Sequence, residues 1–176
     1  EMTIEEMRNF AFSYIDKYSP SKQQVKTYLL KKYLKTSNES VKKNDITDLI
    51  TLVTDDLEKT KFINDKFYSD SKAKNLIQRG SSINKIKNYL ISKGIKDKYI
   101  KETISKIVEK NEDQDFFSAI KICKKKRIGP AREEDNRTLF YKKDISILAR
   151  SGFDFETSKK IMEMEKDDYF RIVKFL

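Results

Sequence analysis

The sequence predicts an all-α fold, an elongated and curved array of tandem three-helix repeats. Four Gly and two Pro in 176 residues are too few for a β protein, which needs such residues at every hairpin. Apolar residues recur at helical spacing, as at Ile83, Ile86 and Leu90, where positions i, i+3 and i+7 share one helix face. One segment also recurs along the chain, which is typical of repeat architectures.

Capping residues set the boundaries of the predicted helices. Ser21 and Ser82 stand directly before a periodic segment, where N-caps belong. Gly94 and Gly152 stand directly after one, as left-handed C-terminal caps do. In chain order we expect helices at 5–18, 21–34, 45–58, 62–78, 82–93, 97–109, 114–126, 138–151 and 154–164, a final turn or two near 167–175, and polar loops at 35–44 and 127–136.

The repeat is visible by direct alignment. The segment SKQQVKTYLLKKYL from Ser21 aligns without gaps on SINKIKNYLISKGI from Ser82, and a weaker copy starts at Lys142. A three-helix unit of this size buries too little apolar surface by itself, so neighbouring units must share faces. The sequence therefore predicts three repeats, at 1–58, 59–110 and 111–176.

Positive charge is concentrated in the middle of the chain. The formal net charge is +10, and Lys outnumbers Arg by 31 to 7. Residues 72–106 hold ten basic and two acidic groups, and residues 118–132 hold six basic groups and no acid. Such a field attracts polyanions or an acidic protein face, although a lysine-rich solvated surface explains the same composition.

Catalytic constellations are missing from the sequence. The chain has no His and therefore no imidazole base or histidine metal ligand, and none of its glycines lies in a phosphate-binding motif. Cys123 is the single cysteine, and without a His partner we expect no nucleophilic role for it. The pairs Asp55–Asp56 and Asp167–Asp168 could bind Mg²⁺, but solvated helix charges are the preferred interpretation. We therefore expect no enzyme, no cofactor and no metal.

Aromatic residues are frequent, with 11 Phe and nine Tyr. Such side chains can stack on nucleobases. At Phe10, Tyr28, Phe67 and Tyr89, however, the repeat register predicts packing in the core or between repeats.

The chain is expected to be a cytoplasmic monomer with no membrane contact. Its wholly apolar stretches run only a few residues, too short to cross a bilayer. The opening EMTIEEMRNF lacks the basic-then-apolar order of a signal peptide. A single cysteine fits a reducing compartment.

The segment FINDKFYSDSKAKNLIQRGSSINKIKNYLISKGI at 62–95 resembles the central module of the RecX family, regulators of the RecA recombinase. The first copy is similar to the family's opening helix pair, and SAIKICKKKRIGP with LARSGF looks like the ending of alphaproteobacterial members. Tyr33 departs from the pattern by replacing a cap Gly, and Tyr68 by replacing a small residue. The resemblance to the central module rests on an acidic-then-aromatic start at Asp65, Phe67 and Tyr68, the last aromatic where the family has a small residue. The positions that match after it are Arg79, Gly80, Ser82, Ile86, Leu90, Lys93, Gly94 and Ile95.

The resemblance implies a non-enzymatic regulator that lies in the groove of the RecA–single-stranded-DNA filament. It would bridge RecA subunits and inhibit strand exchange and ATP hydrolysis in recombination and DNA repair. The alternative is an independent helical nucleic-acid-binding protein, similar to a helix-turn-helix regulator. Lysines that lie off the apolar face of their helix are expected to point to solvent, where they can contact DNA or RecA. The candidate contact residues are therefore the basic residues of the two central blocks: Arg79, Lys85, Lys87, Lys93, Lys124, Lys125, Lys126 and Arg127.

Overall fold

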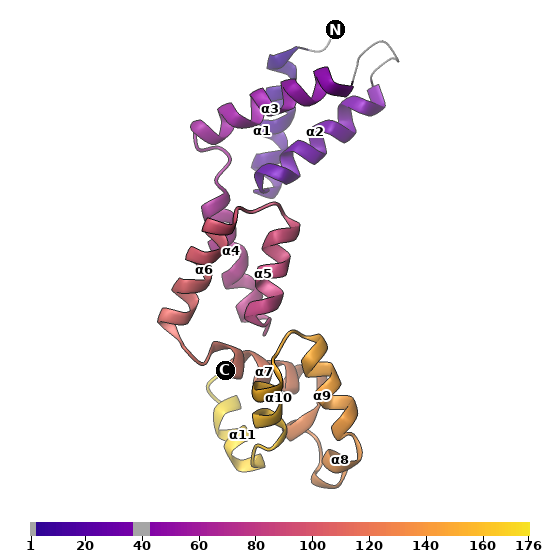
Figure 1. Ribbon diagram of the computed structural model, residues 1–176, viewed down its shortest axis with the longest axis vertical. Helices are drawn as coiled ribbons and strands as arrows, with labels where there is room; N and C mark the ends of the chain where they lie inside the picture. Colours follow the sequence, from indigo (N-terminus) through magenta and orange to yellow (C-terminus); the bar gives the residue numbers. More distant parts are fainter. Residues whose placement is uncertain (1–2, 37–42) are drawn as a thin grey trace. The chain divides into compact units, whose positions relative to one another are not determined.

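The computed structural model describes residues 3–36 and 43–176, and the secondary structure of these residues is entirely helical (Figure 1). The predicted all-α class is confirmed. The helices are α1 (Ile4–Tyr18), α2 (Lys22–Thr36), α3 (Lys43–Lys59), α4 (Asp65–Gln78), α5 (Ile83–Ser92), α6 (Asp97–Lys110), α7 (Gln114–Lys126), the 3₁₀ turn η1 (Gly129–Ala131), α8 (Glu134–Leu139), α9 (Tyr141–Arg150), α10 (Phe155–Met162) and α11 (Lys166–Val173).

Most predicted helix boundaries agree with the structure to within two residues, and three expectations need correction. The helix expected at 62–78 begins only at Asp65, because the Asn64 side chain accepts a hydrogen bond from the Phe67 N–H and caps it there. The helix expected at 138–151 is broken at Phe140 into α8 and α9. The loop expected at 127–136 contains η1 and the start of α8.

The other expected loop, 35–44, falls mostly on residues 37–42, which lie outside the described residues. On either side of them, α2 extends to Thr36 and α3 begins at Lys43.

Contacts divide the chain into two compact units. The first comprises Glu1–Asp70 with Leu90–Ile100, and the second comprises Ser71–Tyr89 with Lys101–Leu176. The division falls within helices α4, α5 and α6.

The first unit has a core formed by α1, α2 and α3. Its buried members are Met7, Ala11, Val25, Leu29, Tyr33, Ile46, Ile50, Val53, Leu57 and Ile63. Full burial of each large aliphatic side chain contributes about 1.5–3 kcal/mol. Tyr33, which aligns with Gly94 of the second copy, is 6 % exposed and packs edge-on against Phe10. A buried ring replaces the cap here, and the helix continues past it.

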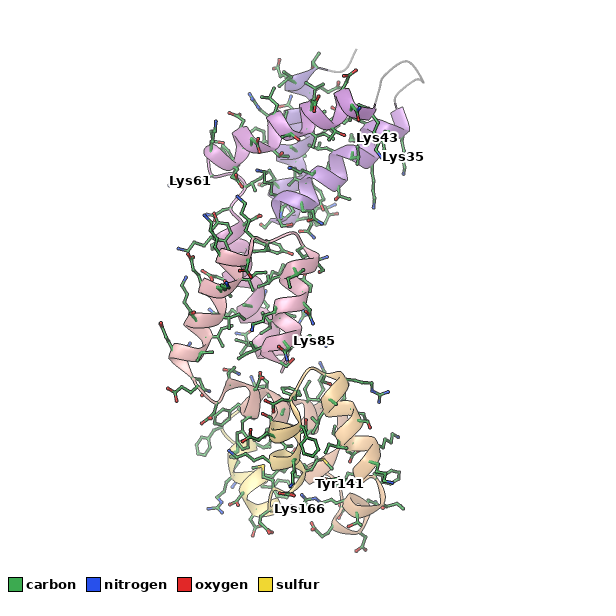
Figure 2. The ribbon with its side chains drawn as sticks, viewed as in Figure 1. Lys35, Lys43, Lys61, Lys85, Tyr141 and Lys166 are labelled. Carbon is green, nitrogen blue, oxygen red and sulfur yellow. The ribbon has the colours of Figure 1, made fainter. Side chains whose placement is uncertain are left out.

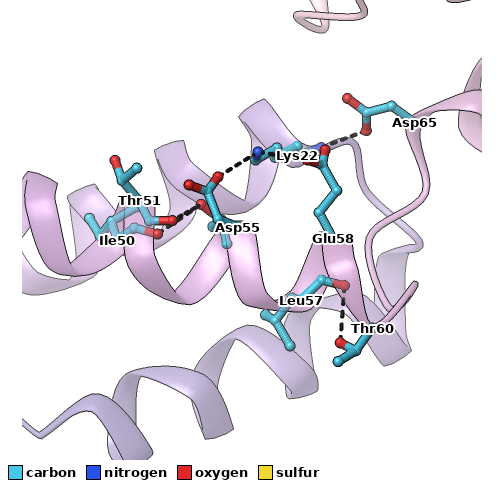
Figure 3. A network of polar contacts seen from close by, with 9 residues as sticks. Lys22, Ile50, Thr51, Asp55, Leu57, Glu58, Thr60 and Asp65 are labelled. Carbon is cyan, nitrogen blue, oxygen red and sulfur yellow. Dashed lines mark hydrogen bonds and ion pairs between the residues drawn. The ribbon is translucent and has the colours of Figure 1, made fainter.

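Polar contacts fix α2 against α3 (Figure 3). The Lys22 ammonium lies 2.7 Å from Asp55 and 3.1 Å from Glu58. Burial lowers the pKa of Lys22, but its hydrogen bonds to the two carboxylates outweigh this effect and raise the pKa above its ordinary value. The same hydrogen bond lowers the pKa of Asp55, so the pair is ionised at neutral pH.

The second unit has its own core. Its buried members are Ala119, Ile120, Cys123, Ile128, Leu148, Phe153, Ile161, Met162 and Tyr169. Beside it, the fully buried Asp144 carboxylate accepts hydrogen bonds from the Gly129 N–H at 2.8 Å and from two Arg132 nitrogens at 2.6 and 2.9 Å. A bidentate Arg–carboxylate pair is geometrically demanding. It fastens η1 to α9.

One aromatic expectation is wrong. Phe10, Tyr28 and Tyr89 are partly buried as predicted, but Phe67 is 66 % exposed. The neighbouring Tyr68 is buried instead, at 5 % exposed. Successive helix positions are about 100° apart around the axis, so Tyr68 faces the interior while Phe67 faces solvent.

Candidate nucleic-acid interface

A recurring joint connects the second helix of one predicted repeat to the following one. In the second unit, the Ser82 hydroxyl donates to the Ser151 carbonyl oxygen at 2.9 Å and accepts from the Lys85 N–H at 3.0 Å. The Ile83 N–H donates to the Asp115 carboxylate at 2.9 Å. These bonds satisfy donors and acceptors that helix ends otherwise leave unpaired.

The first unit contains the same joint, made by residues of the preceding copy. The Ser21 hydroxyl donates to the Lys93 carbonyl oxygen at 2.8 Å, and the Lys22 N–H donates to the Asp65 carboxylate at 2.9 Å. Ser21 also forms a capping box with Gln24, since the Ser21 N–H donates to the glutamine side chain and the Gln24 N–H to the serine hydroxyl. The predicted N-caps are confirmed, and each also contacts a distant helix end.

Glycine is required where each joint closes. At Gly152 φ is +93°, and a Cβ there would lie 2.3 Å from the Ser82 hydroxyl oxygen. At Gly94 φ is +75°, and a Cβ would lie 1.9 Å from Oε1 of Gln23. Both predicted left-handed caps are confirmed, and the close approach of the neighbouring helix is a second reason for glycine.

Asp115 is a joint residue that the sequence analysis missed. Burial raises the pKa of Asp115, and the hydrogen bond from Ile83 opposes that rise. Burial likewise raises the pKa of Asp65 against the bond from Lys22. The sequence signal for both is their position, since each Asp is the first or second residue of the first helix in a predicted repeat.

The candidate residues Arg79, Lys85 and Lys87 are exposed, as predicted. Arg79 follows α4, and Lys87 lies on α5. Lys85, also on α5, is labelled in Figure 2. The turn after Arg79 approaches α7 closely, because a Cβ at Gly80 would lie 3.0 Å from the Lys121 Cβ and 3.2 Å from the Ser118 carbonyl oxygen. The end of α4 therefore lies against the helix that carries the second basic cluster.

That second cluster is the KKKR segment, residues 124–127. Lys124, Lys125 and Lys126 occupy the last turn of α7, and Arg127 is its left-handed C-cap with φ of 57°. All four side chains are exposed. Cations are favourable at a helix C-terminus, where the backbone dipoles leave negative charge. The helix dipole therefore offsets part of the mutual repulsion of these four positive groups.

Lys93 is placed differently from the other candidates. It is only partly exposed, its backbone carbonyl is held by Ser21, and it belongs to the first unit. The other seven candidates belong to the second unit. The structure therefore corrects the expectation that the Lys93 side chain lies fully in solvent.

Within residues 3–36 and 43–176, the structure gives no support to a nucleophilic cysteine or to a Mg²⁺ site at the paired aspartates. Cys123 is fully buried, and burial raises its pKa to about 12, so the thiol is protonated and unreactive at neutral pH. Asp55 pairs with Lys22, Asp56 with Arg8 and Asp168 with Arg171. These residues contain no cluster of three potential metal ligands, and none of their helices could span a bilayer.

The fold and these exposed residues define an all-helical protein with clustered surface cations and a repeated inter-helix joint. The chain is similar to the regulatory protein RecX of Myxococcus xanthus (strain DK1622), with 27 % identity over 168 residues. The match covers 89 % of this chain and 84 % of the relative. No family profile matches the chain, and no solved structure does. The similarity therefore runs through nearly the whole of both chains.

Proposed function

We propose that this protein is a RecX-type regulator that binds the RecA filament on single-stranded DNA and inhibits RecA. The observation that carries the proposal is the similarity to a regulatory protein RecX over 89 % of the chain. The protein would act in recombination, DNA repair and the SOS response, in the cytoplasm, as a non-enzymatic monomer. The LARSGF ending at Leu148–Phe153 further suggests an alphaproteobacterial-like member.

The proposed body is a series of three related units at 1–58, 59–110 and 111–176. Support comes from the joint, since Ser21 and Ser82 make equivalent bonds to Lys93 and Ser151. Chains built of such units extend with each added repeat. An elongated, curved body of this kind can follow the helical groove of a filament.

The proposed contact surface is basic. Arg79, Lys85, Lys87 and the KKKR segment are exposed cations in the second unit, and Lys93 adds one in the first. Lysine is a point charge that suits phosphate and acidic protein surfaces without reading bases. This argues against the alternative of a helix-turn-helix regulator, which needs side chains aimed at base edges.

RecA ATPase activity on single-stranded DNA tests the proposal. Addition of the full chain at substoichiometric ratios to RecA should inhibit hydrolysis, because one bound regulator can affect several filament subunits. Unchanged hydrolysis at equimolar protein, together with sequence-specific shifts of duplex DNA without RecA, would instead establish the helix-turn-helix alternative.

A further inference from the structure

The first unit contains a groove that the sequence analysis did not predict. It lies between α1, the first half of α2 and the end of α5, and its volume is about 330 Å³. This volume falls within the range of small-ligand sites. The lining residues are Tyr14, Gln23, Gln24, Thr27, Tyr28, Lys31, Ser92 and Lys93.

Two aromatic rings give the groove a preformed wall. The rings of Tyr14 and Tyr28 are stacked, with centroids 4.3 Å apart and planes 4° from parallel. Tyr18 also packs against Tyr14, with centroids 5.2 Å apart and planes tilted by 51°. Because the rings hold one another in place, a planar ligand contacting them has little side-chain entropy to overcome.

The charge of the groove has one sign. Among these lining residues of the described chain, Lys31 and Lys93 are the only ionisable ones besides the tyrosines, and none is a carboxylate. Gln23, Gln24, Thr27 and Ser92 add neutral polar groups. The combination of an aromatic wall, ammonium groups and amide or hydroxyl groups matches the parts of a nucleotide, with its planar base, its phosphate and its polar base edge.

The joint described above holds the groove open. Gly94 has no side chain, and Gln23 occupies the space where a Cβ would stand. The Lys93 backbone is fixed by Ser21, and Gln24 is fixed in the capping box. The walls contributed by α2 and by the end of α5 are therefore connected by hydrogen bonds and do not depend on a ligand.

We propose that this groove binds one nucleotide of single-stranded nucleic acid, with the base against Tyr14 and Tyr28 and the phosphate at Lys31 and Lys93. The inference deepens the proposed function, because it gives the first unit its own contact with the DNA strand. Contact with the base makes the groove selective for unpaired strands, since duplex bases are stacked and inaccessible. An acidic peptide would use the two lysines but not the aromatic wall.

The first test is binding of the full chain to a fluorescent oligothymidylate without RecA. Lys31→Glu should weaken binding about three- to tenfold at low salt, as expected for loss of a phosphate contact and reversal of its charge. Lys35→Glu is the matched control, because Lys35 is exposed, lies one turn further along α2 and is outside the groove (Figure 2). It should change the affinity less than about twofold. Equal losses in the two variants would overturn the proposal and indicate a general charge effect.

The second test concerns the base. Photo-crosslinking with an oligonucleotide that carries 5-iododeoxyuridine should place the crosslink on Tyr14 or Tyr28, and excess polyglutamate should not abolish it. Base binding in this groove would be contradicted by crosslinks confined to other residues. It would also be contradicted if polyglutamate of the same total charge as the oligonucleotide abolished the crosslink. The crosslinking result does not depend on the result of the RecA ATPase assay. Crosslinking at Tyr28 without an effect on RecA would overturn the proposed function but would still support nucleotide binding in the groove.

Discussion

The Ser82 hydroxyl donates a hydrogen bond to the backbone carbonyl oxygen of Ser151, 69 positions away in the sequence. Ser21 does the same to Lys93, 72 positions away. In both cases the serine caps the start of its own helix and donates a hydrogen bond to a carbonyl at the end of a distant helix. The residue that carries this carbonyl is followed directly by a glycine, Gly152 or Gly94. One side chain thus satisfies two helix ends, and the same chemistry recurs in both compact units.

Loss of a joint serine should destabilise the protein more than loss of a surface serine. Ser82→Ala removes a cap and leaves a carbonyl without its donor, for an expected cost of about 1–3 kcal/mol in the free energy of unfolding. The matched control is Ser146→Ala, whose exposed hydroxyl bonds only to the Lys142 carbonyl of its own helix. Urea denaturation followed by circular dichroism measures both. Equal stabilities of the two variants would contradict a structural role for the joint.

The joint aspartates should make stability depend on pH in an unusual direction. Burial raises the pKa of Asp115 above its ordinary value of 3.8, so the folded protein holds this proton more tightly than the unfolded chain. The resulting stabilisation is fully present below pH 3.8 and is lost as pH rises through the folded pKa. Asp115→Asn keeps an acceptor for the Ile83 N–H without a charge, so it should lose little stability at neutral pH.

The comparison that tests this prediction is the pH dependence of the free energy of unfolding between mildly acidic and neutral pH. Asp115→Asn should remove this carboxyl group's contribution to the slope, and Asp115→Ala should do so while also costing about 1–2 kcal/mol for the unpaired N–H. If Asp115→Asn destabilised the protein as much as Asp115→Ala at neutral pH, the hydrogen bond from the Ile83 N–H would not be the contribution of Asp115 to stability.

The buried ion pair in the second unit should be worth much more than an exposed one. Arg132→Leu leaves the fully buried Asp144 carboxylate without its bidentate partner, and breaking such a pair costs about 3–5 kcal/mol. Arg171→Leu breaks the exposed pair with Asp168, which should cost less than about 1 kcal/mol. Thermal unfolding measures the loss of stability in each variant, and the loss should be clearly larger for Arg132→Leu. A similar small loss in both would show that η1 is held by its backbone alone.

Neutralising the KKKR segment should weaken RecA inhibition without unfolding the protein. Replacing Lys124, Lys125, Lys126 and Arg127 by Gln removes four exposed charges, and inhibition should fall most steeply as salt is raised if phosphates contribute. A charge-matched control replaces four exposed lysines of the first unit and should inhibit like the unmodified protein: Lys35, Lys43, Lys59 and Lys61. Full inhibition by the KKKR variant at low salt would remove this segment from the proposed interface.

The sequence predicted the helices well, because their limits depend on local chemistry. Ser21, Ser82, Gly94 and Gly152 act on the turns beside them, so their caps could be read directly. Failures occurred where a distant contact decided the outcome. The 3₁₀ turn η1 inside the expected loop is an example, since Gly129 and Arg132 donate hydrogen bonds to Asp144 of α9.

The candidate site was predictable in its charge but not in its arrangement. Exposure of the KKKR segment follows from helix position. The partial burial of Lys93 and the groove around Lys31 depend on α2 lying against the end of α5. That contact joins Ser21 to a residue 72 positions away, and no periodicity in the sequence specifies it.

Disassembly of RecA filaments tests the central claim most directly. RecA is assembled with ATP on single-stranded DNA that carries a fluorophore pair, so filament loss brings the fluorophores together. Substoichiometric addition of the full chain should produce net disassembly, and the KKKR-neutralised variant should require several-fold more protein. Filaments that persist unchanged in an excess of the protein, at a salt concentration where it stays folded, would contradict a role as a RecA regulator.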